Sequence, residues 1–226
     1  MKCWNCSNPL DELLVCSRCG MPQSVGVLGP FDAFGLPPKL RWEEGELLSA
    51  YETLARRCHP DLFRAHRDSR VLTASQTAMR ALNDAYRTVR DPESRLRYVL
   101  SALGHAHAST RTVPEGLQDS VQILDRVLTA AEKAQAAGDR AAWETEQDHL
   151  ASLQVKVENA RDRSNQMLRR IAEEWDRAVA TAGEEWPDMS DDWVDQAVRL
   201  AGERAYLSAV ETRIGEARRK PVETPA

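Results

Sequence analysis

Apolar residues recur at helical spacing along most of this 226-residue chain, and this pattern constrains the fold more than any other feature. Residues three or four positions apart lie on one face of a helix, so each recurring set marks the buried face of one helix. No run of four to eight residues alternates apolar and polar side chains as a half-buried strand does. We therefore expect an all-α protein. The apolar stripes lie at 47–58, 78–89, 96–103, 117–131, 143–179 and 194–214.

Residues at the ends of these stripes predict where several helices begin and end. Asp91-Pro92 predicts a helix start, because Asp is a good N-cap and Pro is tolerated in the first turn, where its missing N–H costs nothing. Gly138 predicts the end of the helix before it. The stripe at 143–179 would belong to a helix of more than 40 residues if it were unbroken. Because the stripe becomes polar around 159–165, we expect a bend or break there.

Charge and composition change along the chain and indicate three sections. Residues 1–28 form a head that holds four of the five cysteines, residues 29–108 form a middle module, and residues 112–220 form a tail. From residue 112 to the end, the chain has 23 acidic and 15 basic residues. The three apolar stripes of the tail need one another to bury their faces, which favours a three-helix bundle. The predicted fold is thus a small N-terminal cysteine-rich head, a helical middle module and a C-terminal helical bundle.

The charge balance and the hydropathy pattern limit the classes of partner. Lys and Arg number 30 against 35 Asp and Glu, and the resulting net charge of −5 argues against a general binder of nucleic acid or anionic membranes. No stretch approaches the roughly 18 apolar residues that a membrane span requires, and the N-terminus has no signal core or presequence character. We therefore expect a cytoplasmic protein that binds no nucleic acid and no membrane. A zinc-ribbon nucleic-acid protein is a weaker alternative, and its binding would depend steeply on salt.

The head contains two C-x-x-C pairs, Cys3-x-x-Cys6 and Cys16-x-x-Cys19, with nine residues between them. Two such pairs can supply the four thiolates of a tetrahedral Zn²⁺ site, and Gly20 lets the backbone turn so that its amides face the thiolates. Two disulfides or a redox pair are the alternatives. A cytoplasmic location disfavours disulfides, and the βαβ context of a thioredoxin-like redox pair is missing. We predict a structural Zn²⁺ ion that supplies folding energy to a segment too short for its own core.

The middle module carries the tripeptide His59-Pro60-Asp61 directly after its first helical stripe. A tripeptide of this kind can be an ordinary loop, but here a second helical stripe and several further motifs follow it. The further motifs are Asn83-x-Ala85-Tyr86, Asp91-Pro92 and Arg95-x-x-Tyr98-Val99-Leu100. This ordered set resembles a J-domain, the module that recruits a DnaK-type chaperone ATPase. With Phe31-Asp32-Ala33-Phe34-Gly35-Leu36-Pro37 before the first long helix, the chain resembles HscB, the J-protein family of iron–sulfur cluster assembly, some members of which also carry a tetracysteine head.

The resemblance implies a co-chaperone that has no catalytic activity of its own. In the family, the His-Pro-Asp loop and the basic face of the preceding helix dock on a DnaK/HscA-type ATPase and accelerate its ATP hydrolysis. Pro60 would stiffen the loop so that its neighbours are presented with little entropy to lose. The corresponding chaperone-binding residues here are His59, Pro60, Asp61, Arg56 and Arg57.

The resemblance also implies that the tail binds the scaffold protein on which the cluster is built, an IscU-type protein. The matching strip here consists of Leu117, Val121, Asp125 and Tyr206. The first tail helix departs from the family pattern, because it lacks the family's Met and run of glutamates. The tail also has extra sequence around 161–192. A J-domain adaptor for a different client is therefore the alternative.

Cys58 and two linker histidines suggest other chemistry only weakly. A Cys-His-Asp nucleophile would need groups brought together from distant positions, whereas neighbours at one helix end point in different directions. We therefore interpret Cys58 as the last buried position of its helix. His105 and His107 could bind a metal ion, but two histidines without further ligands are a weak indication.

Overall fold

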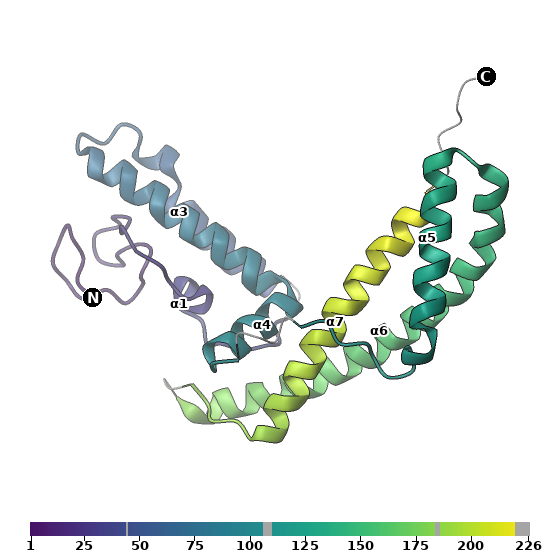
Figure 1. Ribbon diagram of the computed structural model, residues 1–226. Coiled ribbons are helices and arrows are strands. Elements are labelled where there is room, and N and C mark those ends of the chain that lie inside the picture. Colours follow the sequence, from purple (N-terminus) through teal and green to yellow (C-terminus); the bar gives the residue numbers. More distant parts are fainter. Residues whose placement is uncertain (44, 106–109, 184–185, 220–226) are drawn as a thin grey trace. The chain divides into compact units, whose positions relative to one another are not determined.

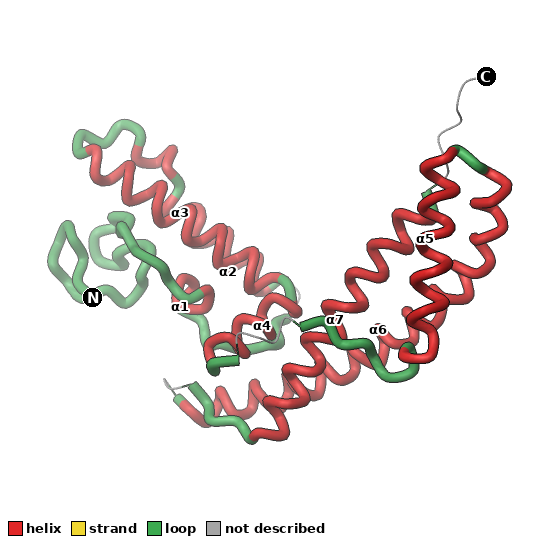
Figure 2. The backbone as a smooth tube through the Cα atoms, in the orientation of Figure 1, coloured by secondary structure: helices red, strands yellow, loops and turns green. Residues whose placement is uncertain are grey.

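The computed structural model describes residues 1–43, 45–105, 110–183 and 186–219 (Figure 1). Across these residues the regular elements are helices and no strand forms, which confirms the predicted all-α architecture (Figure 2). None of the helices in this part of the chain combines the length and apolarity that a membrane span requires. The predicted domain ends at 108 and 220, and His107, lie outside the described residues.

The chain divides into two compact units that are interleaved along the sequence. Unit 1 comprises Met1–Val99 and Ala172–Asp188, and unit 2 comprises Leu100–Ile171 and Met189–Ala226. The segment at 172–188, which the sequence patterns assigned to the tail, thus belongs to the same unit as the head and the middle module. The division into three domains stays a prediction.

Unit 1 is built around a helical hairpin. The short helix α1 (Pro30–Phe34) precedes α2 (Glu46–Cys58), the 3₁₀ turn η1 (Pro60–Phe63) and α3 (Ser69–Arg90). Helix α4 (Pro92–Ala102) follows at once and belongs to unit 1 as far as Val99.

The two long helices of the hairpin are antiparallel. The Tyr51 ring stacks on the Tyr86 ring with 4.5 Å between centroids, so the middle of α2 lies beside the end of α3. At the other end, the buried Ser75 hydroxyl of α3 donates a 2.6 Å hydrogen bond to the Cys58 carbonyl, the last of α2. The loop between them is therefore held at the closed end of the hairpin. The buried apolar side chains of α3 are Val71, Ala74, Ala78, Leu82, Ala85 and Val89.

The predicted start of α4 is confirmed. The Asp91 carboxylate accepts the N–H of Ser94 at 2.7 Å, and Pro92 is the first residue of the helix. Asp91 thus satisfies a donor that the first turn cannot satisfy itself.

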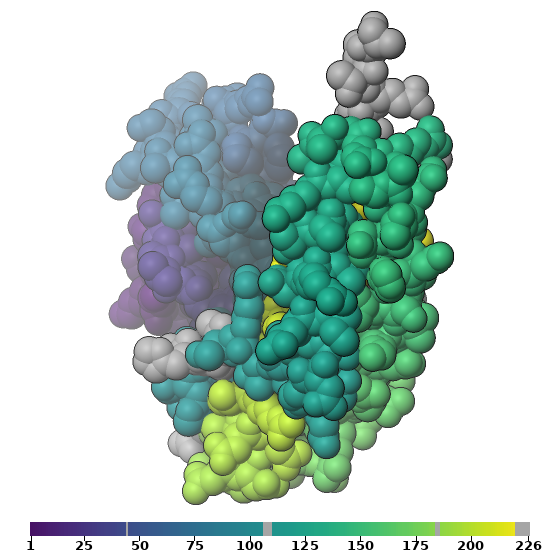
Figure 3. Space-filling view, turned by 45° about the vertical axis from the view of Figure 1, so that its right-hand side comes forward, coloured from purple at the N-terminus to yellow at the C-terminus, as the bar shows by residue number. Residues whose placement is uncertain are grey.

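Unit 2 is the predicted three-helix bundle. It contains η2 (Gln118–Ser120), α5 (Val121–Ala137), the part of α6 (Arg140–Ala182) up to Ile171, and α7 (Asp191–Ala217). Gly138 ends α5 in the left-handed conformation at φ 68°, as predicted. In the space-filling view, α5 (teal) and α6 (green) lie side by side on one face (Figure 3). The core consists of Leu117, Leu124, Val127, Leu128, Ala131, Leu150, Leu153, Val157, Ala160, Leu207, Val210, Ile214 and Ala217.

Of the bend or break predicted around 159–165, the break is wrong, because α6 is helical from its first residue to its last. The polar side chains there have partners on α7. The Arg204 guanidinium donates to the Ser164 hydroxyl at 3.2 Å and to the Asn165 side-chain oxygen at 2.9 Å. The polar interval is thus a hydrogen-bonded contact between two helices, and the helix needs no break to avoid burying it.

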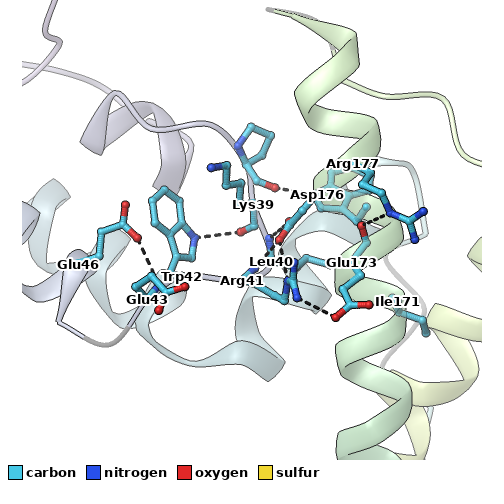
Figure 4. A network of polar contacts seen from close by, with 12 residues as sticks. Lys39, Leu40, Arg41, Trp42, Glu43, Glu46, Ile171, Glu173, Asp176 and Arg177 are labelled. Atoms are coloured by element: carbon cyan, nitrogen blue, oxygen red, sulfur yellow. Dashed lines mark hydrogen bonds and ion pairs between the residues drawn. The ribbon is translucent and has the colours of Figure 1, made fainter.

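The end of α6 is tied to the segment that precedes α2 in unit 1. The Asp176 carboxylate accepts the backbone N–H of Leu40 at 2.7 Å and of Arg41 at 3.1 Å (Figure 4). The Arg41 guanidinium also donates to Glu173 at 2.8 Å. One carboxylate therefore satisfies two backbone donors of a loop that has no regular partner of its own.

Aromatic rings extend this contact to α4 and α1 of unit 1. The fully buried Trp175 indole donates its N–H to the Pro38 carbonyl at 2.6 Å. Ring contacts continue from Trp175 to Trp186 (5.8 Å between centroids), then to Tyr98 (6.2 Å) and to Phe31 (5.8 Å). These contacts explain why 172–188 belongs to unit 1.

Candidate functional site: the His-Pro-Asp corner and the four-cysteine head

The corner His59-Pro60-Asp61 forms where α2 ends and η1 begins. His59 leaves the helix with extended backbone (φ −62°, ψ 131°), and Pro60 takes the first position of η1, where its fixed φ suits the turn. The His59 Nδ1 atom accepts the N–H of Asp61 at 3.2 Å. This hydrogen bond needs an unprotonated Nδ1, so the neutral ring carries its proton on Nε2.

The corner exposes a hydrogen-bond donor and a hydrogen-bond acceptor to solvent, and the backbone that carries them is anchored. The His59 side chain is 50% exposed and the Asp61 side chain 58%. The Asp61 carboxylate pairs with Arg64 at 2.7 Å, and the Ser75 hydroxyl anchors the end of α2 directly below. The arrangement can donate from the His59 Nε2–H and accept at the Asp61 carboxylate with little ordering on binding.

Cys58 directly precedes this corner, but its side chain is buried whereas those of His59 and Asp61 are exposed. Its Sγ lies 3.8 Å from the Met79 Sδ, and burial raises the pKa of the Cys58 thiol to about 11. A nucleophilic cysteine needs the opposite shift, toward the thiolate. The structure thus confirms the interpretation of Cys58 as the last buried position of α2.

The two arginines at the end of α2 have different surroundings. Arg56 is exposed and pairs with Glu52, one turn earlier on the same helix, at 3.5 Å. Arg57 instead pairs with Glu12 of the head at 2.6 Å, and this bond raises the pKa of the Arg57 guanidinium. Sequence reasoning missed Glu12, because a contact between residues so far apart in the chain leaves no local pattern.

The four head cysteines converge on one point. All four sulfurs lie within 4.8 Å of one another, with 3.6 Å between Cys3 and Cys19 and 3.8 Å between Cys6 and Cys16. Four sulfurs at the usual Zn–S distance of about 2.3 Å are about 3.8 Å apart in a tetrahedron. The spacing fits a four-coordinate metal site and is much longer than a disulfide bond of about 2.05 Å. These cysteines can hold a metal ion.

The two halves of the head repeat the same backbone turn. The N–H of Ser7 donates to the Cys3 carbonyl and the N–H of Gly20 donates to the Cys16 carbonyl, both at 2.9 Å. Both donors have positive φ, 61° and 71°, in the region that favours glycine. The sequence indicated this turn at Gly20 but not at Ser7, which adopts the same conformation despite its side chain.

Donors around Cys3 and Cys6 favour the thiolate form of these two residues, whereas burial raises the pKa of Cys19 to about 11. The Asn8 side chain donates to the Cys6 sulfur at 3.3 Å, and the buried Gln23 side chain donates to the Cys3 sulfur at 3.5 Å. Burial alone would raise the pKa of Cys3, but the N–H groups of Cys6 and Asn5 lower it to about 6. A thiolate is the form that binds metal.

The four residues of the predicted client strip do not share one surface. Leu117 is only 2% exposed and belongs to the core of unit 2. Val121 is half-buried, and Tyr206 is half-buried and packs against that core. The Asp125 carboxylate is exposed and pairs with Arg213 of α7 at 3.0 Å. The structure therefore leaves Val121, Asp125 and Tyr206 accessible and does not expose Leu117.

His105 does not join a metal site with other ligands. It is exposed just after α4. Among the residues that the structure describes, the four cysteines are the only cluster of three or more potential metal ligands.

Comparison with known proteins then decides the family. No family model matches the chain. The Co-chaperone protein HscB homolog of Vibrio vulnificus (strain YJ016) is 31% identical over 138 residues, which cover 58% of this chain and 80% of the relative. This chain belongs to the HscB co-chaperone family. Its role is accordingly that of a co-chaperone.

A second relative supports the same assignment, and two solved HscB structures share the fold. The HscB homolog of Burkholderia cenocepacia (strain J2315) is 46% identical over 104 residues, covering 45% of this chain and 59% of the relative. The crystal structure of human HscB shares the fold with a TM-score of 0.55 at 22% identity, over 96% of this chain and 98% of the human one. HscB from Vibrio cholerae has a TM-score of 0.50 at 20% identity, over 83% and 96% of the two chains.

Proposed function

We propose that this HscB-family chain recruits a DnaK/HscA-type chaperone through its His59-Pro60-Asp61 corner and stimulates the chaperone's ATPase. The observation that carries the proposal is the exposed donor and acceptor of His59 and Asp61 on a rigid hairpin end. Asp61 can accept a charge-assisted hydrogen bond from a partner arginine. The nearby cations Arg56 and Arg64 would attract an acidic partner.

The test is the steady-state ATPase rate of a purified chaperone of this type from the same source. The full chain should raise the rate, and His59→Gln should remove the stimulation. His66→Gln is the matched control, because His66 is also exposed and its Nδ1 accepts the N–H of Asp68 at 3.2 Å in the same loop. Equal loss in both variants, or no stimulation by the unaltered chain, would contradict the proposal.

We further propose that unit 2 delivers an iron–sulfur scaffold protein of the IscU type to that chaperone. The accessible surface around Val121, Asp125 and Tyr206 is the proposed binding site, and it offers apolar contact beside a carboxylate. Tyrosine combines a large apolar body with a polar tip, which suits the centre of an interface.

A pull-down with purified scaffold protein tests this second step. Val121→Glu and Tyr206→Ala should each reduce retention of the scaffold. Ile123→Glu is the control, because Ile123 is exposed and lies two positions along α5 from Val121, on another face of the helix. Reduced retention only in the control would show that the client uses a different face.

A J-domain adaptor for a different client is the second candidate. Two observations favour it. Leu117 is buried in the bundle core and so cannot contact a client. The Asp125 carboxylate already forms an ion pair with Arg213, which also pairs with Glu132 at 3.1 Å. Retention of another protein, with no scaffold retained, would select this candidate.

We propose that the head holds one structural Zn²⁺ through Cys3, Cys6, Cys16 and Cys19. Four cysteine ligands leave no open coordination position, so the ion would fold the head and would not take part in a reaction. Metal analysis of protein purified under reducing conditions should give one zinc per chain, and Cys16→Ser should lower this content. All five cysteines are free of disulfides, which suits a reducing compartment such as the cytoplasm.

A further inference from the structure

The head contacts the hairpin on both sides of the His-Pro-Asp corner. On α2, the Arg57 Nη2 lies 2.6 Å from the Glu12 Oε2. On α3, the Arg70 guanidinium lies over the Trp4 ring at 5.3 Å from its centroid. Arg57 is in the last turn of α2 and Arg70 is in the first turn of α3, so the head contacts the two helix ends that frame the corner.

One of these contacts changes the charge of the proposed docking face. Arg57 is one of the two arginines in the last turn of α2, and Glu12 neutralises it. The Arg57 and Glu12 side chains are 36% and 41% exposed, so a partner can reach part of each, although the Glu12 Oε2 atom that faces Arg57 is itself buried. An exposed ion pair contributes little net stability, and a carboxylate on a partner can replace Glu12 without a large penalty.

We propose that Glu12 is an internal competitor for the chaperone: it occupies Arg57, and an acidic docking partner must displace it to use that arginine. This inference rests on the proposed recruitment of a chaperone through the hairpin end. The chaperone then binds more weakly than it would to the arginines of α2 without Glu12. The head thus lowers the affinity of the chain for the chaperone.

The position of Glu12 depends on the fold of the head. Glu12 lies between the two cysteine pairs, and the chain just after it is anchored by the buried Leu14 and Val15. The Leu14 carbonyl accepts the N–H of Gln23 at 2.9 Å. The neighbouring Asp11 is also acidic and exposed, but its carboxylate accepts the Ser17 hydroxyl at 3.3 Å and forms no ion pair with Arg57. Asp11 therefore provides a matched control for charge.

The experiment measures binding of the full chain to the same purified chaperone, in low and in physiological salt. Glu12→Gln should lower the Kd by about two- to fivefold, the range that an exposed ion pair allows. Asp11→Asn makes the same change in net charge and should leave the Kd unchanged. In an Arg57→Gln background, Glu12→Gln should have no further effect, because the arginine it shields is gone.

Several outcomes would overturn the inference. An unchanged or higher Kd for Glu12→Gln means that the carboxylate supports docking or does not affect it. An equal gain from Asp11→Asn means that only net charge matters. These results differ from a failure of the proposed function, in which the unaltered chain neither binds the chaperone nor raises its ATPase rate. If His59→Gln abolishes stimulation while Glu12→Gln changes nothing, the recruitment stands and only the role of Glu12 is wrong.

Discussion

Burial decides the chemistry of Cys58, the one cysteine that lies outside the head. Its neighbour His59 is exposed and polar, although the two residues are adjacent in the chain. The difference arises because α2 ends between them, so one side chain faces α3 and the next faces solvent. Sequence periodicity predicted the burial of Cys58, which depends on the helical register, whereas the exposure of His59 follows from the end of the helix before Pro60.

We predict that the Cys58 thiol of the folded chain reacts slowly with iodoacetamide at pH 8. With its pKa raised to about 11 by burial, only about one thiol in a thousand is a thiolate at that pH. Because the raised pKa favours the neutral thiol, its contribution to stability is present below pH 9 and is lost as the pH rises toward 11. Mass spectrometry of the alkylated peptide, with urea-unfolded chain as the control, measures the rate. Equal rates in the folded and unfolded chain would contradict the prediction.

At the scale of elements, local chemistry determines most helix ends and tertiary contacts determine the rest. Asp91, Pro92 and Gly138 end or begin helices through their own backbone preferences, so the sequence alone was sufficient there. The expected break in α6 failed because its polar residues have partners on α7, and no local pattern contains those partners.

The start of α7 offers a test of such a local signal. The Ser190 hydroxyl accepts the N–H of Trp193 at 3.3 Å as the N-cap of this helix. Ser190→Ala should lower the free energy of unfolding by about 1 kcal/mol, whereas Ser190→Asn should retain most of it, because an amide oxygen can accept the same hydrogen bond. Urea denaturation followed by far-UV circular dichroism measures both. A larger loss for Asn than for Ala would rule out a capping role.

At the scale of the whole molecule, the segment at 172–188 is the part that the sequence could not assign. Its apolar stripe continues that of α6, so periodicity joins it to the tail. Its membership of unit 1 depends on contacts with Pro38, Leu40 and Tyr98, which are far away in the sequence. The ion pair between Glu12 and Arg57 was unpredictable for the same reason. By contrast, the exposed corner and the cysteine cluster are local motifs, and both were found from the sequence.

We predict that Trp175→Ala destabilises unit 1 by about 3–5 kcal/mol, the usual effect of removing a fully buried aromatic side chain. Trp186→Ala is the comparison, because the Trp186 side chain is partly exposed and should cost clearly less. Hydrogen exchange of the α3 amides, read by mass spectrometry, reports on unit 1 directly. Protection of α3 should fall in Trp175→Ala. If it is unchanged, the contacts of Trp175 do not stabilise the hairpin.

The interleaved course of the chain also has a consequence for biosynthesis. A ribosome releases residues 1–99 long before residues 172–188, yet both belong to the same unit. The hydrogen bonds from Trp175 to Pro38 and from Leu40 to Asp176 can therefore form only after residues 100–171 have emerged. Folding of this unit is thus expected to finish late in translation, when most of the polypeptide has already been made.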